Sequence, residues 1–160
     1  MTNMTQNVTR PVKGTVENQV YGLVGYTDRG GGSEAYTSFK GAIMAIDVSD
    51  IDGYVQPHQS GITSASGDVF VGIAEEQVSV TSSDTSQGDK SILCLTKGTV
   101  GFPVGSITVT DLGAPIYASD DDAITTTSSN NLWIGRLINV DSINAWVRID
   151  NATGTTNSAT

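Results

Sequence analysis

The chain has 160 residues, with 8 Lys and Arg against 17 Asp and Glu, a net charge of −9 and a single cysteine. This length suits one domain that folds without metals, and one cysteine excludes an intrachain disulfide. The acidity argues against nucleic-acid binding, and no apolar run approaches the roughly 20 residues that cross a membrane.

The first 15 residues are polar and patternless, and they predict a flexible N-terminal arm. Arg10 and Lys13 are its charges, whereas residues 14–160 carry 6 basic and 17 acidic side chains, a net charge of −11. The acidity itself fits either plain solubility or a partner with a basic face. The arm has no hydrophobic stretch typical of signal peptides, so we expect folding in the cytoplasm where the chain is made.

Such an arm can add as a strand to the edge of a partner's sheet, and its basic residues can meet acidic groups there. The candidate binding residues are therefore Val8, Thr9, Arg10, Pro11, Val12 and Lys13. The alternative is a frayed terminus. We expect deletion of residues 1–13 to leave folding intact, because the expected core strands lie downstream.

The next segment predicts loops and strands. The stretch DRGGGSE (residues 28–34) lacks the Gly-Lys-Ser/Thr of a phosphate-binding loop and the last glycine of G-x-G-x-x-G, so it predicts a flexible loop. Residues 34–46 are the one helix candidate, but Gly41 interrupts them. We therefore expect at most one short helical turn before that glycine.

Short β-branched or aromatic runs bounded by turn residues predict strands downstream. They are VFVGIA (69–74), SILCLT (91–96), LWIGRL (132–137) and NAWVRI (144–149). In NAWVRI, Ala145, Val147 and Ile149 share one face of the strand. In SILCLT both faces are mainly apolar, which predicts cover on both sides. Residues 151–160 predict a flexible C-terminal tail.

Two parts of the chain resemble each other. Each has Gly-Ala, an apolar strand, an aspartate cluster, a second extended run, a strand with a glycine after three residues, and a closing strand. This predicts a duplication with pseudo-repeats at about 41–97 and 113–150, in which Gly72 and Gly135 are equivalent. The predicted fold is all-β: one compact barrel- or sandwich-like domain over residues 16–150 with an internal strand-turn-strand duplication.

Asp120, Asp121 and Asp122 raise the question of a metal site or acid–base chemistry. In an extended chain adjacent side chains point to alternate faces, so the three cannot converge on one ion without a turn. Asp also favours turns, because its carboxylate accepts hydrogen bonds from nearby backbone N–H groups. We therefore expect a hairpin turn, with a cation site as the alternative. The cluster at residues 47–52 fails as an EF-hand, because Val48 and Gln59 stand where carboxylates are needed.

Signatures of catalysis are weak. His58 and Cys94 are the sole His and Cys, so a Cys–His dyad is possible in number only. Cys94 lies in an apolar run and predicts a buried, inert thiol, and His58 predicts a loop residue. A zinc site needs three or four His, Cys or carboxylate ligands at suitable spacing, and one His with one Cys does not meet this requirement. The G-x-S-x-G motif that carries the nucleophile of serine hydrolases does not occur. We expect no enzymatic activity, no metal and no cofactor.

One family resemblance extends over about residues 40–150. The runs GDVFVGIAEEQV, GDKSILCLTKGTVGFPVGS, GAPIYASDDDAITTTSSNNLWIGRLIN and INAWVRID resemble the capsid cement, or head decoration, proteins of tailed bacteriophages. The shared features are a glycine near a strand end, a strand ending in Lys-Gly, a G-x-P motif, an acidic turn into T-T-T and a closing V-R-I strand. The segment up to Phe39 departs from the shorter members.

The resemblance implies a compact β-rich domain, often a trimer, bound outside the lattice of the major capsid protein. There it would clamp capsomers against the pressure of packaged DNA, which places the chain on the virion surface. The alternative from another class is a β-structured adhesin or tail-fibre module for host carbohydrate. Such modules usually show clustered exposed aromatics, whereas Trp133 and Trp146 lie in predicted strands, which favours packing.

Overall fold

The computed structural model describes residues 4–29, 32–50, 53–59, 62–63 and 67–150. Its elements in this part of the chain are, in order, β1 (Val12–Gly22), β2 (Tyr36–Ser38), β3 (Ile43–Ile46), the 3-10 helix η2 (Val48–Asp50), β4 (Gln56–Pro57), β5 (Val69–Ala74), β6 (Val78–Val80), β7 (Ser91–Pro103), the 3-10 helix η3 (Val109–Asp111), β8 (Pro115–Ala118), β9 (Ile124–Thr125), β10 (Leu132–Val140) and β11 (Asn144–Asp150). None of the described helices is long and apolar enough to span a membrane.

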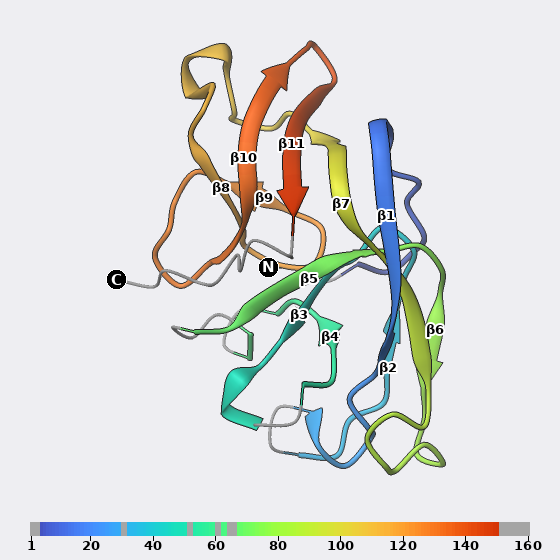
Figure 1. The fold of residues 1–160 in the computed structure, drawn as a ribbon. Helices are drawn as coiled ribbons and strands as arrows, with labels where there is room; N and C mark the ends of the chain where they lie inside the picture. Colours follow the sequence, from blue (N-terminus) through green and yellow to red (C-terminus); the bar gives the residue numbers. More distant parts are fainter. Residues whose placement is uncertain (1–3, 30–31, 51–52, 60–61, 64–66, 151–160) are drawn as a thin grey trace.

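The predicted all-β class is confirmed, although the large sheet does not close into a barrel. Nine strands form one sheet in the order β4-β3-β5-β7-β11-β10-β8-β9, with β1 also paired to β7, while β2 and β6 form a separate pair. The long strand β7 joins two lobes of the molecule (Figure 1). It pairs with β5 at Cys94 and Leu95 and with β11 along residues 97–103.

Counted inward from its two edges, the sheet shows the same arrangement of four strands twice. We call β4, β3, β5 and the first part of β7 the N-terminal unit, and β9, β8, β10 and β11 the C-terminal unit. The register agrees too, with one residue skipped at the same point in both units. The matched pairs are Met44 with Gly72 and Ala45 with Phe70 in one unit, and Ile116 with Gly135 and Tyr117 with Trp133 in the other.

Gly72 and Gly135 have the same role in the two units, as the sequence predicts. A methyl group added to Gly72 would collide with the carbonyl of Leu95 on β7, and one added to Gly135 would collide with the carbonyl of Arg148 on β11. Each glycine therefore lets a bulged strand lie close against its neighbour.

Both units contribute to one apolar core. Its members come from β3, β5 and β7 as well as from β8, β10 and β11, and they include Ile43, Phe70, Ile134 and Val147. The predicted shared face of Ala145, Val147 and Ile149 on β11 is confirmed, and the structure shows that this face lies in the core. A second core contains Met4, Leu23, Met44 and Cys94. The first core crosses the boundary between the units and packs them together, whereas the second lies within residues 4–94.

The helix candidate at residues 34–46 forms strands instead. β2 and β3 lie on either side of Gly41, which has a φ of 90°. The aromatic Tyr36 and the β-branched Ile43 of this stretch are buried, together with Met44 and Ala45 of β3. Burial against the sheet thus decides the conformation here, because such side chains favour a pleated surface.

Candidate binding surface

The predicted flexible arm is packed onto the body from Met4 onward. The backbone N–H of Val8 donates to the Lys40 carbonyl at 2.9 Å, and the N–H of Gly101 donates to the Pro11 carbonyl at 2.8 Å. Met4 is buried in the second core, and β1 begins at Val12 and pairs with β7. The prediction of a flexible arm over residues 1–15 is therefore wrong for residues 4–15, and residues 1–3 lie outside the described part.

Arg10 is buried, so it is not available to a partner. Its Nε donates to the Gly41 carbonyl at 2.6 Å, and its Nη2 forms an ion pair with Asp122 at 2.8 Å. The guanidinium carbon lies 4.6 Å from the centroid of the Phe102 ring. Burial lowers the pKa of Arg10, and the hydrogen bond and charge of Asp122 act in the opposite direction. This cation stabilises the fold internally.

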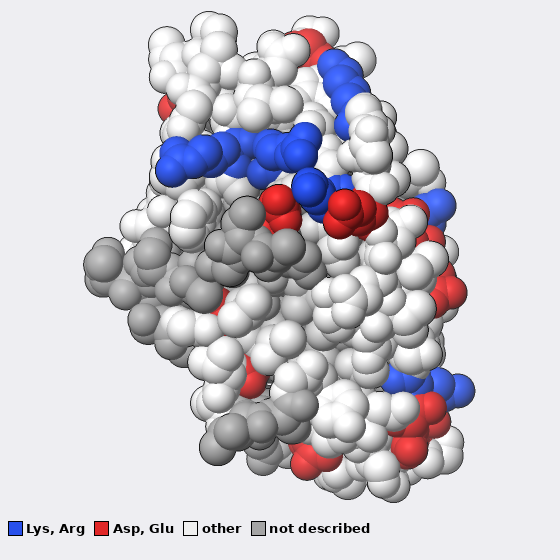
Figure 2. Space-filling view, viewed as in Figure 1, with Lys and Arg blue, Asp and Glu red and all other residues white. Residues whose placement is uncertain are grey.

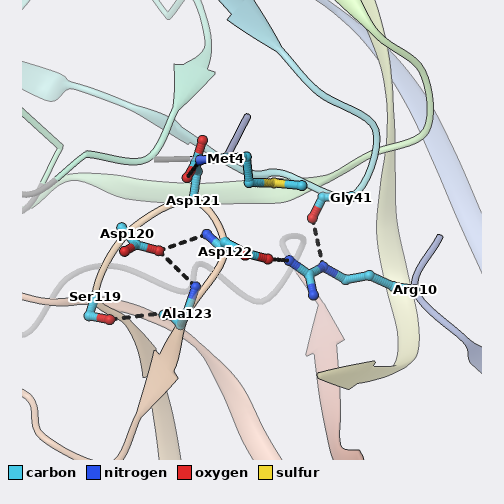
Figure 3. Close-up of polar contacts among 8 residues, drawn as sticks. All are labelled: Met4, Arg10, Gly41, Ser119, Asp120, Asp121, Asp122 and Ala123. Carbon is cyan, nitrogen blue, oxygen red and sulfur yellow. Dashed lines mark hydrogen bonds and ion pairs between the residues drawn. The ribbon is translucent and has the colours of Figure 1, made fainter. Parts of the chain in front are cut away.

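The predicted hairpin turn at the three aspartates is confirmed, and each carboxylate has a different contact (Figure 3). Asp120 accepts hydrogen bonds from the backbone N–H groups of Asp122 and Ala123, both at 2.8 Å, which fixes the turn. Asp121 accepts from the N–H of Met4 at 2.9 Å, and Asp122 pairs with Arg10. The turn thus anchors residues 4–10. The ion pair between Arg10 and Asp122 was not predicted from the sequence, because its only signal there is opposite charge at two distant positions.

Burial raises the pKa of Asp121 to about 6, since the charged carboxylate is poorly solvated there. The Met4 N–H opposes this shift, and the neighbouring charges of Asp120 and Asp122 add to it. Among the described residues, no group of three or more His, Cys, Asp or Glu side chains could hold a metal ion.

The six predicted binding residues do not form one exposed set. Arg10 is buried and Val8 half-buried, while Thr9, Pro11, Val12 and Lys13 are exposed. Lys13 lies over the Trp146 ring, with Nζ 3.9 Å from the ring centroid. It therefore belongs to the surface of the C-terminal unit.

That surface carries a row of basic side chains that sequence reasoning missed. On the face of the sheet opposite the core, Arg136 pairs with Arg148, Arg148 with Thr99, and Thr99 with Lys13. We call Lys13, Arg136 and Arg148 the basic row, and all three are exposed. Figure 2 shows a band of Lys and Arg atoms across the upper half of this face. Only strand register brings these residues together, so no local motif could reveal them.

The two residues weighed for a catalytic dyad have separate structural roles. His58 is fully buried, with Nδ1 2.7 Å from the Thr63 hydroxyl and Nε2 2.9 Å from the Ala118 carbonyl. Burial lowers its pKa to about 4. Cys94 lies buried in β7, where burial raises the thiol pKa to about 12. The predictions of a buried thiol and of a loop histidine are both confirmed, although the loop position of His58 is buried and connects β4 to β8.

Both tryptophans pack against the protein. Trp146 is 6% exposed and donates its Nε1 hydrogen to Asp141 at 2.8 Å, and Trp133 is half-buried and paired with Tyr117. Comparisons with protein family models, curated proteins and solved structures gave no match. The resemblance to head decoration proteins therefore stays a prediction from the sequence.

Proposed function

We propose that this chain is a structural virion protein that binds the outside of a tailed-bacteriophage capsid and stabilises the head against DNA pressure. One observation carries the proposal: residues responsible for the resemblance occupy positions that determine the fold. Gly72 and Gly135 allow the close approach of strands, and Asp120 closes the turn within GAPIYASDDDAITTT. Residues at such positions are the ones that a common fold would require, which supports the proposal more than a similar composition would.

The physical properties of the chain suit this role. A net charge of −9 on a small domain keeps unassembled copies apart in solution. A cement protein performs no reaction, so its work is the sum of many contacts across a lattice. If copies are linked as an oligomer, with a trimer as the expected form, weak contacts to the major capsid protein become strong through avidity.

The test is binding to expanded, empty capsids of the virus that encodes the chain. Cosedimentation should show saturable binding, and bound capsids should resist heating to a higher temperature than bare ones, because a ligand of the intact lattice stabilises it. Unexpanded capsids serve as the control. Absence of binding, together with retention on a host glycan array, would favour the adhesin alternative.

A further inference from the structure

The basic row stands out against the charge of the rest of the molecule. Arg10 and Arg29 are buried, so they add little to the surface charge. Three of the remaining Lys and Arg residues lie in one cross-strand row, in which Arg136 and Arg148 are direct neighbours and Thr99 separates Arg148 from Lys13, with strands about 4.8 Å apart. In Figure 2 most of the visible Asp and Glu atoms lie below the band of Lys and Arg. The basic row is therefore a local basic patch on a chain whose net charge is −9.

The row is also unfavourable in the isolated protein. Arg136 and Arg148 face each other directly on antiparallel strands, an arrangement that destabilises a sheet. None of the ion pairs found among the described residues includes either arginine. One row away, by contrast, Lys97 lies between Glu17 and Asp150, at 3.9 Å and 4.0 Å. A partner that supplies carboxylates would relieve the repulsion, since guanidinium groups bind carboxylates in a bidentate manner.

Exposed apolar side chains border the row. We call them the apolar tip, and their exposed fractions run from 47% to 72%: Val109, Leu112, Ile138 and Ile143. The Gly113 N–H donates to the Leu137 carbonyl at 2.9 Å, which brings the segments of Leu112 and Ile138 together. Arg136 Nη1 donates to the Gly113 carbonyl at 3.1 Å, so the tip adjoins the row.

We propose that the basic row and the apolar tip form one docking surface for an acidic protein surface that presents carboxylates beside apolar side chains. On the proposed function, on which this identification rests, that partner is the major capsid protein. Arginine next to exposed apolar groups is typical of protein interfaces. Nucleic acid fits less well, because it offers few apolar groups to the tip and the rest of the chain repels phosphates.

The decisive variant is the double substitution Arg136→Glu with Arg148→Glu in the full chain. Its matched control is Lys40→Glu with Lys90→Glu, which makes the same change in net charge elsewhere on the surface. We expect the first to weaken cosedimentation with expanded capsids more than about tenfold and the control to change it less than about twofold, because charge reversal at the contact removes complementarity. Raising the salt concentration should weaken the wild-type chain more than the Arg variant.

A second readout does not need the capsid. Titration of the isotope-labelled chain with a poly-glutamate peptide should shift the amide resonances of Arg136, Arg148 and their neighbours. A heparin fragment and a DNA duplex of equal charge are the comparison ligands, and analytical ultracentrifugation tests a second copy of the chain as the occupant. Circular dichroism confirms that each variant is folded.

The outcomes separate the two proposals. If wild-type protein binds capsids and the Arg variant binds them equally well, the docking surface is wrong while the proposed function stands. If capsids are not bound but poly-glutamate shifts the amide resonances of the basic row, the proposed function is wrong and the proposed docking surface stands. Tighter binding of DNA or heparin than of poly-glutamate, or self-association abolished by the Arg variant, overturns the assignment to an acidic partner protein.

Discussion

At the scale of single residues, Gly72 and Gly135 are among the glycines that have no space for a side chain. Each faces a backbone carbonyl of the next strand, so a methyl group has no space and the strands must separate. We predict that Gly135→Ala lowers the free energy of unfolding by about 2 kcal/mol or more, and Gly72→Ala by a similar amount. Urea denaturation measures both. Gly32→Ala is the control, because Gly32 has open space around it, and a loss as large there would contradict the explanation.

The ion pair between Arg10 and Asp122 gives a second prediction. Asp122→Asn removes the charge that faces a buried guanidinium, so we expect a loss of about 2 kcal/mol in the free energy of unfolding. Lys97→Gln removes a cation from a surface ion-pair cluster, and there we expect less than about 1 kcal/mol. Equal losses in the two variants would show that the burial of Arg10 has no energetic consequence.

At the scale of elements, the N-terminal segment, which the sequence predicts to be a flexible arm, is part of the folded domain from Met4 onward. Its contacts with Lys40, Gly101 and the acidic turn join both units, and Met4 fills part of the second core. We now predict that deletion of residues 1–11 lowers the free energy of unfolding by about 3 kcal/mol or more, through loss of a buried side chain and a buried ion pair. Chemical denaturation followed by fluorescence measures it.

The control replaces Thr5 and Gln6, which are exposed in the same segment, by Ser and Asn. That variant should unfold at the same denaturant concentration as the full chain. A truncated chain with unchanged stability would restore the original expectation of a dispensable arm.

Elements with a local signal could be predicted from the sequence, and those fixed by distant contacts could not. The alternation in NAWVRI and the apolar run SILCLT correspond to β11 and part of β7, because period-2 patterns report directly on burial. Residues 4–11 have no such pattern, and their order depends on Asp121 and Asp122, more than 100 residues away. The basic row is of the same kind, since strand register alone assembles it.

At the scale of the whole molecule, His58 links the two units, because it follows β4 and its Nε2 contacts the Ala118 carbonyl of β8. Its pKa of about 4 in the folded state lies below the ordinary 6.5, so between these pH values the unfolded chain binds a proton that the folded chain does not. Acidification through this window therefore destabilises the fold. Asp121 acts oppositely: its folded pKa of about 6 exceeds the ordinary 3.8, so acidification there favours folding.

We predict that the stability of His58→Asn falls less between pH 6.5 and pH 4 than that of the wild type, by about 2 kcal/mol. The stability of Asp121→Asn should fall more steeply over its own window, between about pH 6 and pH 3.8. Urea denaturation at several pH values compares the wild type with the two variants. All other titratable groups are the same in the three chains, so a difference between their pH profiles comes from the substituted residue. Three parallel pH profiles would mean that neither buried group controls the acid response.

Cys94 makes this chain its own reporter of motion. The thiol is the single one in the sequence and lies in β7 between Gln19 of β1 and Ala74 of β5. With a pKa of about 12 it holds almost no thiolate at neutral pH, and its burial excludes reagents. A thiol-labelling reagent can therefore react only while β7 separates from its neighbours. The rate of Cys94 labelling therefore reports how often this part of the sheet opens. The ratio of the rates for free and capsid-bound protein would measure how far attachment to the capsid suppresses that opening.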